Sequence, residues 1–158
     1  MSLANTDREA LRQGFRPDRI RVLFVGESPP ANRTFFYQAD STLYHRTHEA
    51  FAAVFHEQVC GSGKAFLRFF QARGCYLEDL CTEPVNQLPR AERRRAREAG
   101  VASLAKRLAA FQPEVVVVAM EGIQKHVKQA ARQAGPAPGA YGCSPSPRKG
   151  IRVSMLSS

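Results

Sequence analysis

The chain has 158 residues, of which 44% are hydrophobic, so its length fits one domain with a substantial apolar core. It has no run of the roughly 18 apolar residues that a membrane-spanning helix needs, and its N-terminus lacks the apolar stretch of a signal peptide. We therefore expect a cytoplasmic protein without membrane contact, and a monomer. The four cysteines have irregular spacing and form no CxxC motif, so we expect reduced thiols and no metal or cofactor.

The charge of the chain is strongly positive. Lys and Arg total 23 against 14 Asp and Glu, which gives a net charge of +9 and a pI near 10.0. Such a balance suggests a polyanionic partner, although an arginine-rich proteome from a GC-rich genome explains it equally well. A cluster of arginines favours a phosphate-facing surface, and it also has the pattern of a solvated helix face. The cluster comprises Arg90, Arg93, Arg94, Arg95 and Arg97.

The first elements are a short helix and a buried strand. Thr6 and Glu9 have the spacing of a capping box, which predicts a helix that Pro17 ends. Residues 20–25 are apolar and β-branched without alternation, which indicates a strand buried on both faces, and Gly26 ends it. Apolar periodicity then predicts further elements in chain order. These are helices over 51–59 and 66–73, a strand over 75–80, a helix over 90–111, a strand over 114–120 and a helix over 123–134.

Strands that alternate with helices predict an α/β fold, with three α/β/α layers around a central, mainly parallel sheet. Ligands of such sheets bind at the carboxyl ends of the strands, so the loops GESPP (26–30) and EDLCTEP (78–84) lie on the expected working edge. We assign residues 1–135 to this domain. Residues 136–158, rich in Pro, Gly and Ser, are expected to form an irregular tail.

Three segments resemble known functional motifs but lack residues that those motifs require. CGSGKAF (60–66) lacks the glycine and the hydroxyl residue of a phosphate-binding loop. GESPP lacks the second glycine of a nucleophile elbow. His45 and His48 have no evident third ligand, and ordinary surface histidines are the simpler interpretation.

The loop after the first strand carries more information. Gly26 permits a sharp turn, the two prolines stiffen it, and Glu27 is held at the edge of the sheet. Three aromatic residues follow in a polar segment, RTFFY (33–37). A carboxylate beside aromatic rings suits a planar heteroaromatic ligand, and stacking contributes about 1–3 kcal/mol per base. Phe35 is expected to fill the core rather than to stack on a ligand.

Three segments of the chain resemble the uracil-DNA glycosylase superfamily. GESPP (26–30) resembles the family's first motif, GEAPG or GxNPG; CYLEDLCTEPVNQLP (75–89) resembles its central strand YITNVVKCRPP; and FQPEVVVVAMEGIQKHV (111–127) resembles its third strand and helix. Together they span most of residues 20–134. Each motif is only moderately specific, and their order and spacing are more specific than any one of them.

The resemblance implies a base-excision enzyme that flips a nucleotide out of DNA and hydrolyses its N-glycosidic bond. Glu27 matches the acidic position of the first motif, which implies the catalytic role of activating water and stabilising a cationic sugar. The implied base-binding residues are Gly26, Ser28, Pro29, Asp79 and a stacking ring, Phe36 or else Tyr37. The expected contacts to DNA phosphates are Arg33, Arg90, Arg93 and Arg94.

The sequence also departs from the family. Asp79 stands where the family reads the base with Asn, and a carboxylate only accepts hydrogen bonds, so we expect preference for a base with an amino group unless Asp79 is protonated. No cysteine precedes Gly26, which predicts no iron–sulfur cluster. The family's last motif, a His-Pro-Ser-like loop, is absent. We hypothesise that residues from about Gly142 onward arise from a frameshift or from a sequencing error.

Two other functions remain open at this stage. One is a catalytically inactive nucleic-acid-binding relative, and the other is an α/β domain that binds a small nucleotide. Loss of excision in Glu27→Gln with DNA binding retained distinguishes an enzyme from the first alternative. Steep salt dependence of duplex binding argues against the second.

Overall fold

The computed structural model describes residues 4–56, 61–135 and 140–142, which form one α/β domain. Its centre is a four-stranded sheet in the order β2-β1-β3-β4, and each neighbouring pair is parallel. The register pairs Gly26 with Asp79 and Val25 with Val118, so the carboxyl ends of the three longer strands lie at one edge. The strands are β1 (Val22–Gly26), β2 (Cys75–Asp79), β3 (Val115–Val118) and β4 (Ala140–Gly142).

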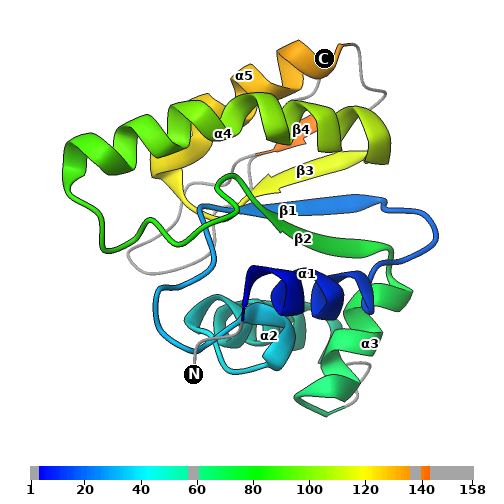
Figure 1. Ribbon diagram of the computed structural model, residues 1–158. Coiled ribbons are helices and arrows are strands. Elements are labelled where there is room, and N and C mark those ends of the chain that lie inside the picture. The colour runs from blue at the N-terminus through cyan, green and yellow to red at the C-terminus, as the bar shows by residue number, and fades with distance from the viewer. Residues whose placement is uncertain (1–3, 57–60, 136–139, 143–158) are drawn as a thin grey trace.

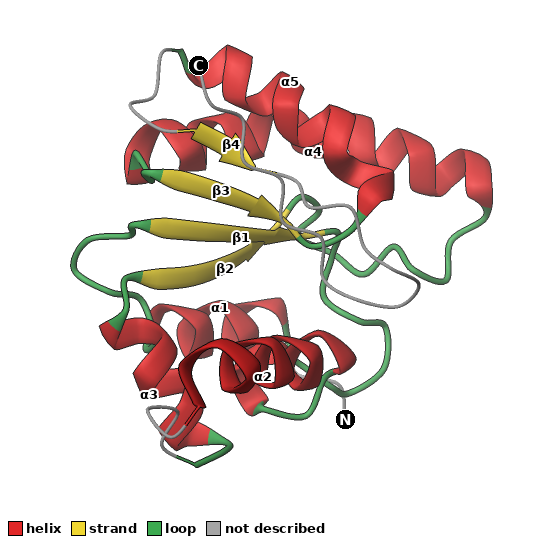
Figure 2. Cartoon of the chain, turned by 180° about the vertical axis from the view of Figure 1, so that it is seen from behind, coloured by secondary structure: helices red, strands yellow, loops and turns green. Residues whose placement is uncertain are grey.

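Helices cover both faces of the sheet, which confirms the expected three-layer α/β/α fold. In Figures 1 and 2, α4 and α5 lie on one face, and α1, α2 and α3 lie on the other. The α-helices are α1 (Asn5–Gln13), α2 (Thr42–Phe55), α3 (Lys64–Ala72), α4 (Arg90–Phe111) and α5 (Gln124–Ala134). Two 3₁₀ turns, η1 (Phe36–Gln38) and η3 (Glu121–Ile123), follow the loops after β1 and β3. None of these described helices is long and apolar enough to cross a membrane.

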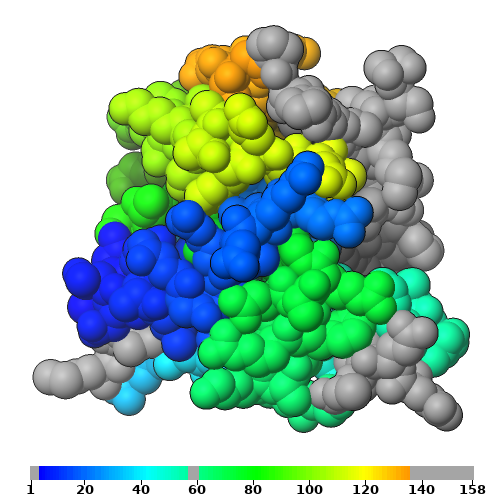
Figure 3. Space-filling model, turned by 90° about the vertical axis from the view of Figure 1, so that its right-hand side faces the viewer, coloured from blue at the N-terminus to red at the C-terminus, as the bar shows by residue number. Residues whose placement is uncertain are grey.

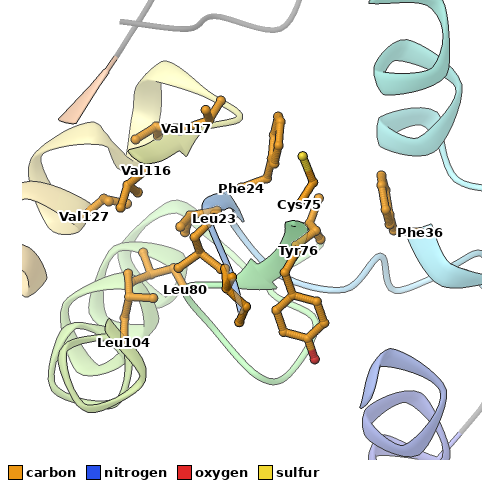
Figure 4. Packing of buried hydrophobic residues seen from close by; sticks show 14 of the residues in the cluster. Leu23, Phe24, Phe36, Cys75, Tyr76, Leu80, Leu104, Val116, Val117 and Val127 are labelled. Carbon is orange, nitrogen blue, oxygen red and sulfur yellow. The ribbon is translucent and has the colours of Figure 1, made fainter. Parts of the chain in front are cut away.

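Apolar side chains of the central strands fill both faces of the sheet. Leu23 and Leu104 lie together on the side of α4, whereas Phe24 and Phe36 lie on the side of α2 (Figure 4). The ring of Phe24 packs 5.3 Å from that of Phe70 in α3. Because a fully buried apolar side chain contributes about 1.5–3 kcal/mol, this double-sided burial explains why β1 is apolar at consecutive positions.

The sheet edge opposite the carboxyl ends faces the viewer in Figure 3. Here the blue segment after α1 lies between α3 and the yellow-green end of α4. Arg68 donates to the carbonyl of Gly14 at 2.9 Å, and the Arg16 guanidinium lies 5.4 Å from the Phe111 ring centroid. These contacts fasten the chain before it enters β1.

Four details differ from the sequence predictions. The helix expected over 51–59 is α2, which begins at Thr42, where the Ser41 side chain caps it, and ends at Phe55. The helix α1 begins at Asn5 with Ala4 as its N-cap residue and no side-chain cap, so Thr6 is already inside the helix and cannot cap it. Val54 is an apolar residue of the segment predicted to be an amphipathic helix, but it is 69% exposed because Phe51 and Phe55 both turn towards Phe69. Within the segment expected to be irregular, residues 140–142 form β4, while the predicted frameshift region after Gly142 lies outside the described residues.

Candidate active site

A cavity of about 400 Å³ opens at the carboxyl ends of β1, β2 and β3, and we name it the edge pocket. Hydrogen bonds hold together the two loops expected on the working edge. The amide of Val85 donates to Ser28 Oγ at 3.2 Å, and the amide of Ala31 donates to Asn86 Oδ1 at 3.0 Å. The pocket is lined by residues 26–30, 41–43, 119 and 120, and by Asn32, Thr34, Phe35, Phe36, Arg46, Leu77, Asp79 and Asn86.

Glu27 lines the edge pocket, and its carboxylate is held by two arginines of α4. Oε1 accepts from Nε of Arg93 at 2.7 Å and from Nε of Arg97 at 2.6 Å, while Oε2 accepts from Nη2 of Arg93. Burial raises the pKa of Glu27, but the hydrogen bonds and charges of the two arginines outweigh it, so the pKa lies below its ordinary value. The carboxylate is therefore ionised at neutral pH and is a weak base.

The pairing leaves little room on the Glu27 carboxylate. A carboxylate offers about four acceptor positions, and three of them are used by the arginines. The remaining position is on Oε2, and it suffices for one water molecule or one ligand donor. This geometry favours an electrostatic role for Glu27 over proton abstraction.

Asp79 lies at the end of β2 and also lines the edge pocket. A Cβ atom on Gly26 would lie only 2.7 Å from Oδ1 of Asp79, so only glycine lets this carboxylate approach the first strand. The other oxygen, Oδ2, accepts from Nη2 of Arg12 at 3.0 Å. Burial raises the pKa of Asp79, and the nearby Arg12 only partly opposes this shift.

Arg12 belongs to a buried ion-pair network that the sequence analysis missed. Its guanidinium, 4% exposed, donates from Nη1 to Glu78 Oε2 at 2.6 Å as well as to Asp79. Arg107 from α4 donates to the same Glu78 oxygen at 2.8 Å. The arginine also lies 5.5 Å from the centroid of Phe35. The sequence indicates this network only through the spacing of Arg8 and Arg12, which are one helical turn apart and therefore lie on the same, buried side of α1.

The three aromatic residues after β1 have different surroundings. Phe35 and Phe36 both line the edge pocket, although they are buried against the core. Phe35 was expected only to fill the core, and the structure adds a pocket-lining face to that role. Tyr37 does not line the pocket: its hydroxyl accepts from the Leu77 amide at 2.7 Å and donates to the Leu77 carbonyl at 3.1 Å. Of the two rings expected as candidates for stacking, Phe36 lines the pocket, whereas the Tyr37 hydroxyl is bonded to the main chain of β2.

Ser28 and Pro29 lie in the pocket wall as expected, together with Gly26. The Ser28 hydroxyl is committed to the loop itself, since it donates to the Pro29 carbonyl at 3.1 Å and accepts from the Val85 amide. Its role is therefore to fix the shape of the pocket wall. Met120, at the end of β3, completes the opposite side.

The predicted phosphate-binding arginines separate into two groups. Arg33 is exposed in the loop after β1 and lines neither cavity of this edge. The others lie along a second hollow of about 760 Å³ between α4 and the start of α5, which we name the arginine groove. Its polar side chains are those of Arg90, Arg93, Arg94, Arg97, Lys125 and His126, and Leu88, Ala91 and Gly122 complete its wall.

Within the parts of the chain that the structure describes, no group of three or more His, Cys, Asp or Glu side chains is arranged to hold a metal ion. The two histidines considered in the sequence lie on α2, and Nε2 of His48 lies 3.0 Å from the carbonyl oxygen of Gly61.

No protein-family model matches this sequence, and no curated protein is significantly similar to it. The resemblance to the uracil-DNA glycosylase superfamily thus rests on the three motifs.

Proposed function

We propose that the protein binds a base extruded from DNA in the edge pocket and hydrolyses its N-glycosidic bond. The observation that supports this most directly is the meeting of Glu27, Phe36 and Asp79 in one pocket. The first two come from the connection between β1 and α2, and Asp79 comes from the end of β2. A ring for stacking, a polar group for reading the base and a carboxylate for the sugar are the parts that base excision requires. The first motif alone supplies only one of them.

The proposed chemistry needs one water molecule and no cofactor. The bond between the base nitrogen and C1′ breaks, and its electron pair leaves with the base, which takes up a proton. The water oxygen forms the new bond to C1′ and loses a proton to solvent. The sugar is cationic in between, and the ionised Glu27 carboxylate stabilises that charge. Two unit charges 4 Å apart attract by about 4 kcal/mol at an effective dielectric constant of 20, and the two paired arginines reduce this gain.

The deciding experiment is an excision screen with Glu27→Gln. Duplex and single-stranded oligonucleotides would carry uracil, hypoxanthine, xanthine or alkylated bases. We expect the variant to lose about a hundredfold in excision rate, which corresponds to about 2.7 kcal/mol, while its affinity for DNA persists. Glu114→Gln is the matched control, because Glu114 pairs with Arg19 at the opposite edge of the sheet. Equal excision by both variants would refute the catalytic role of Glu27.

Asp79→Asn tests how the base is read. An amide both donates and accepts, which suits the O4 and N3–H of uracil, whereas an ionised carboxylate only accepts. We expect the variant to excise uracil faster than the parent protein and to act more slowly on bases with an exocyclic amino group. An unchanged base preference would show that Asp79 does not read the base.

A second candidate is a nucleic-acid-binding protein without catalytic activity. The observation that favours it is the pairing of Glu27 with Arg93 and Arg97, which occupies most of the carboxylate. If no substrate in the screen is cleaved but both Glu27→Gln and the parent bind DNA with steep salt dependence, this candidate replaces the first.

A further inference from the structure

The arginine groove contains one side chain that the catalytic proposal does not use. His126 lies in the wall of the groove on the first turn of α5, and it is only 3% exposed. Neither of its ring nitrogens has a hydrogen-bond partner within the described part of the chain. A neutral imidazole carries one N–H group, and a buried donor without a partner is costly and uncommon in native proteins. The groove therefore holds a donor that lacks an acceptor.

Most of the charges around His126 are positive, and among the described residues Glu98 is the one carboxylate that acts on it directly. Arg90 and Arg94 extend from the first turns of α4, and Lys125 is exposed beside His126 on α5. Two further cations, Arg93 and Arg97, reach the groove and share the single carboxylate of Glu27. Arg94 also lies 4.0 Å from the exposed carboxylate of Glu98. Two carboxylates cannot neutralise five neighbouring cations, so the groove keeps a positive potential that attracts anions.

The groove and the edge pocket meet at one ion pair. Glu27 lines the pocket, and the arginines that hold it line the groove. A ligand with a planar base in the pocket would therefore place a neighbouring anionic group within reach of the groove. Nucleotides have this composition, since each base is followed along the strand by a phosphate.

We propose that the arginine groove is a phosphate-binding site, in which Lys125, Arg90 and Arg94 neutralise a phosphate group and His126 donates a hydrogen bond to it. The site rests on the proposed function for its orientation, because the base pocket lies beside it. The shared chemistry is a phosphate ester, and it is supplied either by a DNA strand or by a free nucleotide. His126 and Lys125 extend the set of phosphate contacts beyond those that the sequence predicted.

The test measures binding of a fluorescein-labelled oligothymidylate by anisotropy over about 50–200 mM NaCl. Lys125→Gln should weaken binding and lower the slope of log affinity against log salt by about 0.7 for a single strand. Lys106→Gln is the matched control: it removes the same charge from an exposed position of α4 outside the groove. If Lys125→Gln and Lys106→Gln have the same affinity and the same salt slope, the groove is not a phosphate site.

His126→Phe separates the hydrogen bond from the general charge. Because the histidine is neutral, its replacement should weaken binding several-fold and leave the salt slope unchanged. If His126→Phe does not fold, Lys125→Gln alone still decides the proposal. Competition with thymidine monophosphate and with inorganic phosphate distinguishes the sources: displacement at micromolar nucleotide identifies a free nucleotide, and displacement only by oligonucleotide identifies a strand.

The same variants distinguish the two proposals from each other. If Lys125→Gln still excises the base and binds DNA as tightly as the parent protein, the phosphate site in the groove is refuted, while the proposed base-excision function stands. If DNA binding depends on Lys125 but the protein excises no base, the phosphate site in the arginine groove is supported and the proposed enzymatic function is refuted.

Discussion

Replacing Arg12 by Met removes a buried cation that two carboxylates share. Glu78 keeps its second partner, Arg107 at 2.8 Å, whereas Asp79 loses its ion pair with Arg12 at 3.0 Å. Arg107 reaches only the main-chain oxygen of Asp79, so it cannot take over the carboxylate. Breaking a buried pair by removing one partner costs about 3–5 kcal/mol, and we expect a loss of free energy of unfolding in this range.

The loss should depend on pH. Burial raises the pKa of Asp79 above its ordinary value, so its contribution to stability is complete at low pH and decreases as pH rises through the folded-state pKa. Without Arg12, which opposes that rise, the pKa of Asp79 goes higher still. We therefore expect the destabilisation of Arg12→Met to be larger near about pH 8 than near about pH 5.

The assay is urea denaturation followed by circular dichroism at both pH values. Arg19→Met is the control, because Arg19 is 75% exposed and its pair with Glu114 should contribute no more than about 1 kcal/mol. A loss below about 1 kcal/mol for Arg12→Met, equal at the two pH values, would refute the argument that this cation holds Asp79 in place.

Two further substitutions test how the site is supported. Tyr37→Phe leaves the buried amide and carbonyl of Leu77 without their side-chain partner. We expect the free energy of unfolding in urea to fall by about 1–3 kcal/mol and the base preference to stay unchanged. A changed base preference would show that the Tyr37 side chain contacts the bound base. Gly100→Ala puts a Cβ 2.5 Å from the Leu80 carbonyl oxygen, so α4 must move. We expect a lower melting temperature and weaker DNA binding. A melting temperature and an affinity equal to those of the parent protein would contradict this close contact.

Most of the strands and helices could be predicted because apolar periodicity is a local property, whereas the first part of α2 and the strand β4 were not. The run Val115–Val118 is β-branched throughout, and it forms β3 as expected. The meeting of Gly26 and Asp79 at one edge also followed, since parallel strands align their carboxyl ends. The resemblance supplied Glu27 and Phe36 as members of one site, and the structure places both in the edge pocket.

The partners of the charged residues could not be predicted. Arg97 appeared in the sequence only as one arginine of a basic cluster, and nothing local shows that it turns towards Glu27, 70 residues earlier. Sequence periodicity shows which side of a helix is buried, but it does not show which distant residue each arginine of that helix contacts. Tyr37 shows the same limit, because the choice between pocket and core depends on the position of Leu77, 40 residues away.

The pairing of Arg12 with β2 also has a consequence during synthesis of the chain. Glu78 follows Arg12 by 66 residues, and at about 5–20 residues per second a ribosome needs about 3–13 s to make that stretch. Until then α1, with only nine residues, is too short to be stable alone, since isolated helices are marginal below about 12–15 residues. The helix α1 is thus made well before its partner strand β2, and Arg12 stays without Glu78 and Asp79 while β1, α2 and α3 are completed.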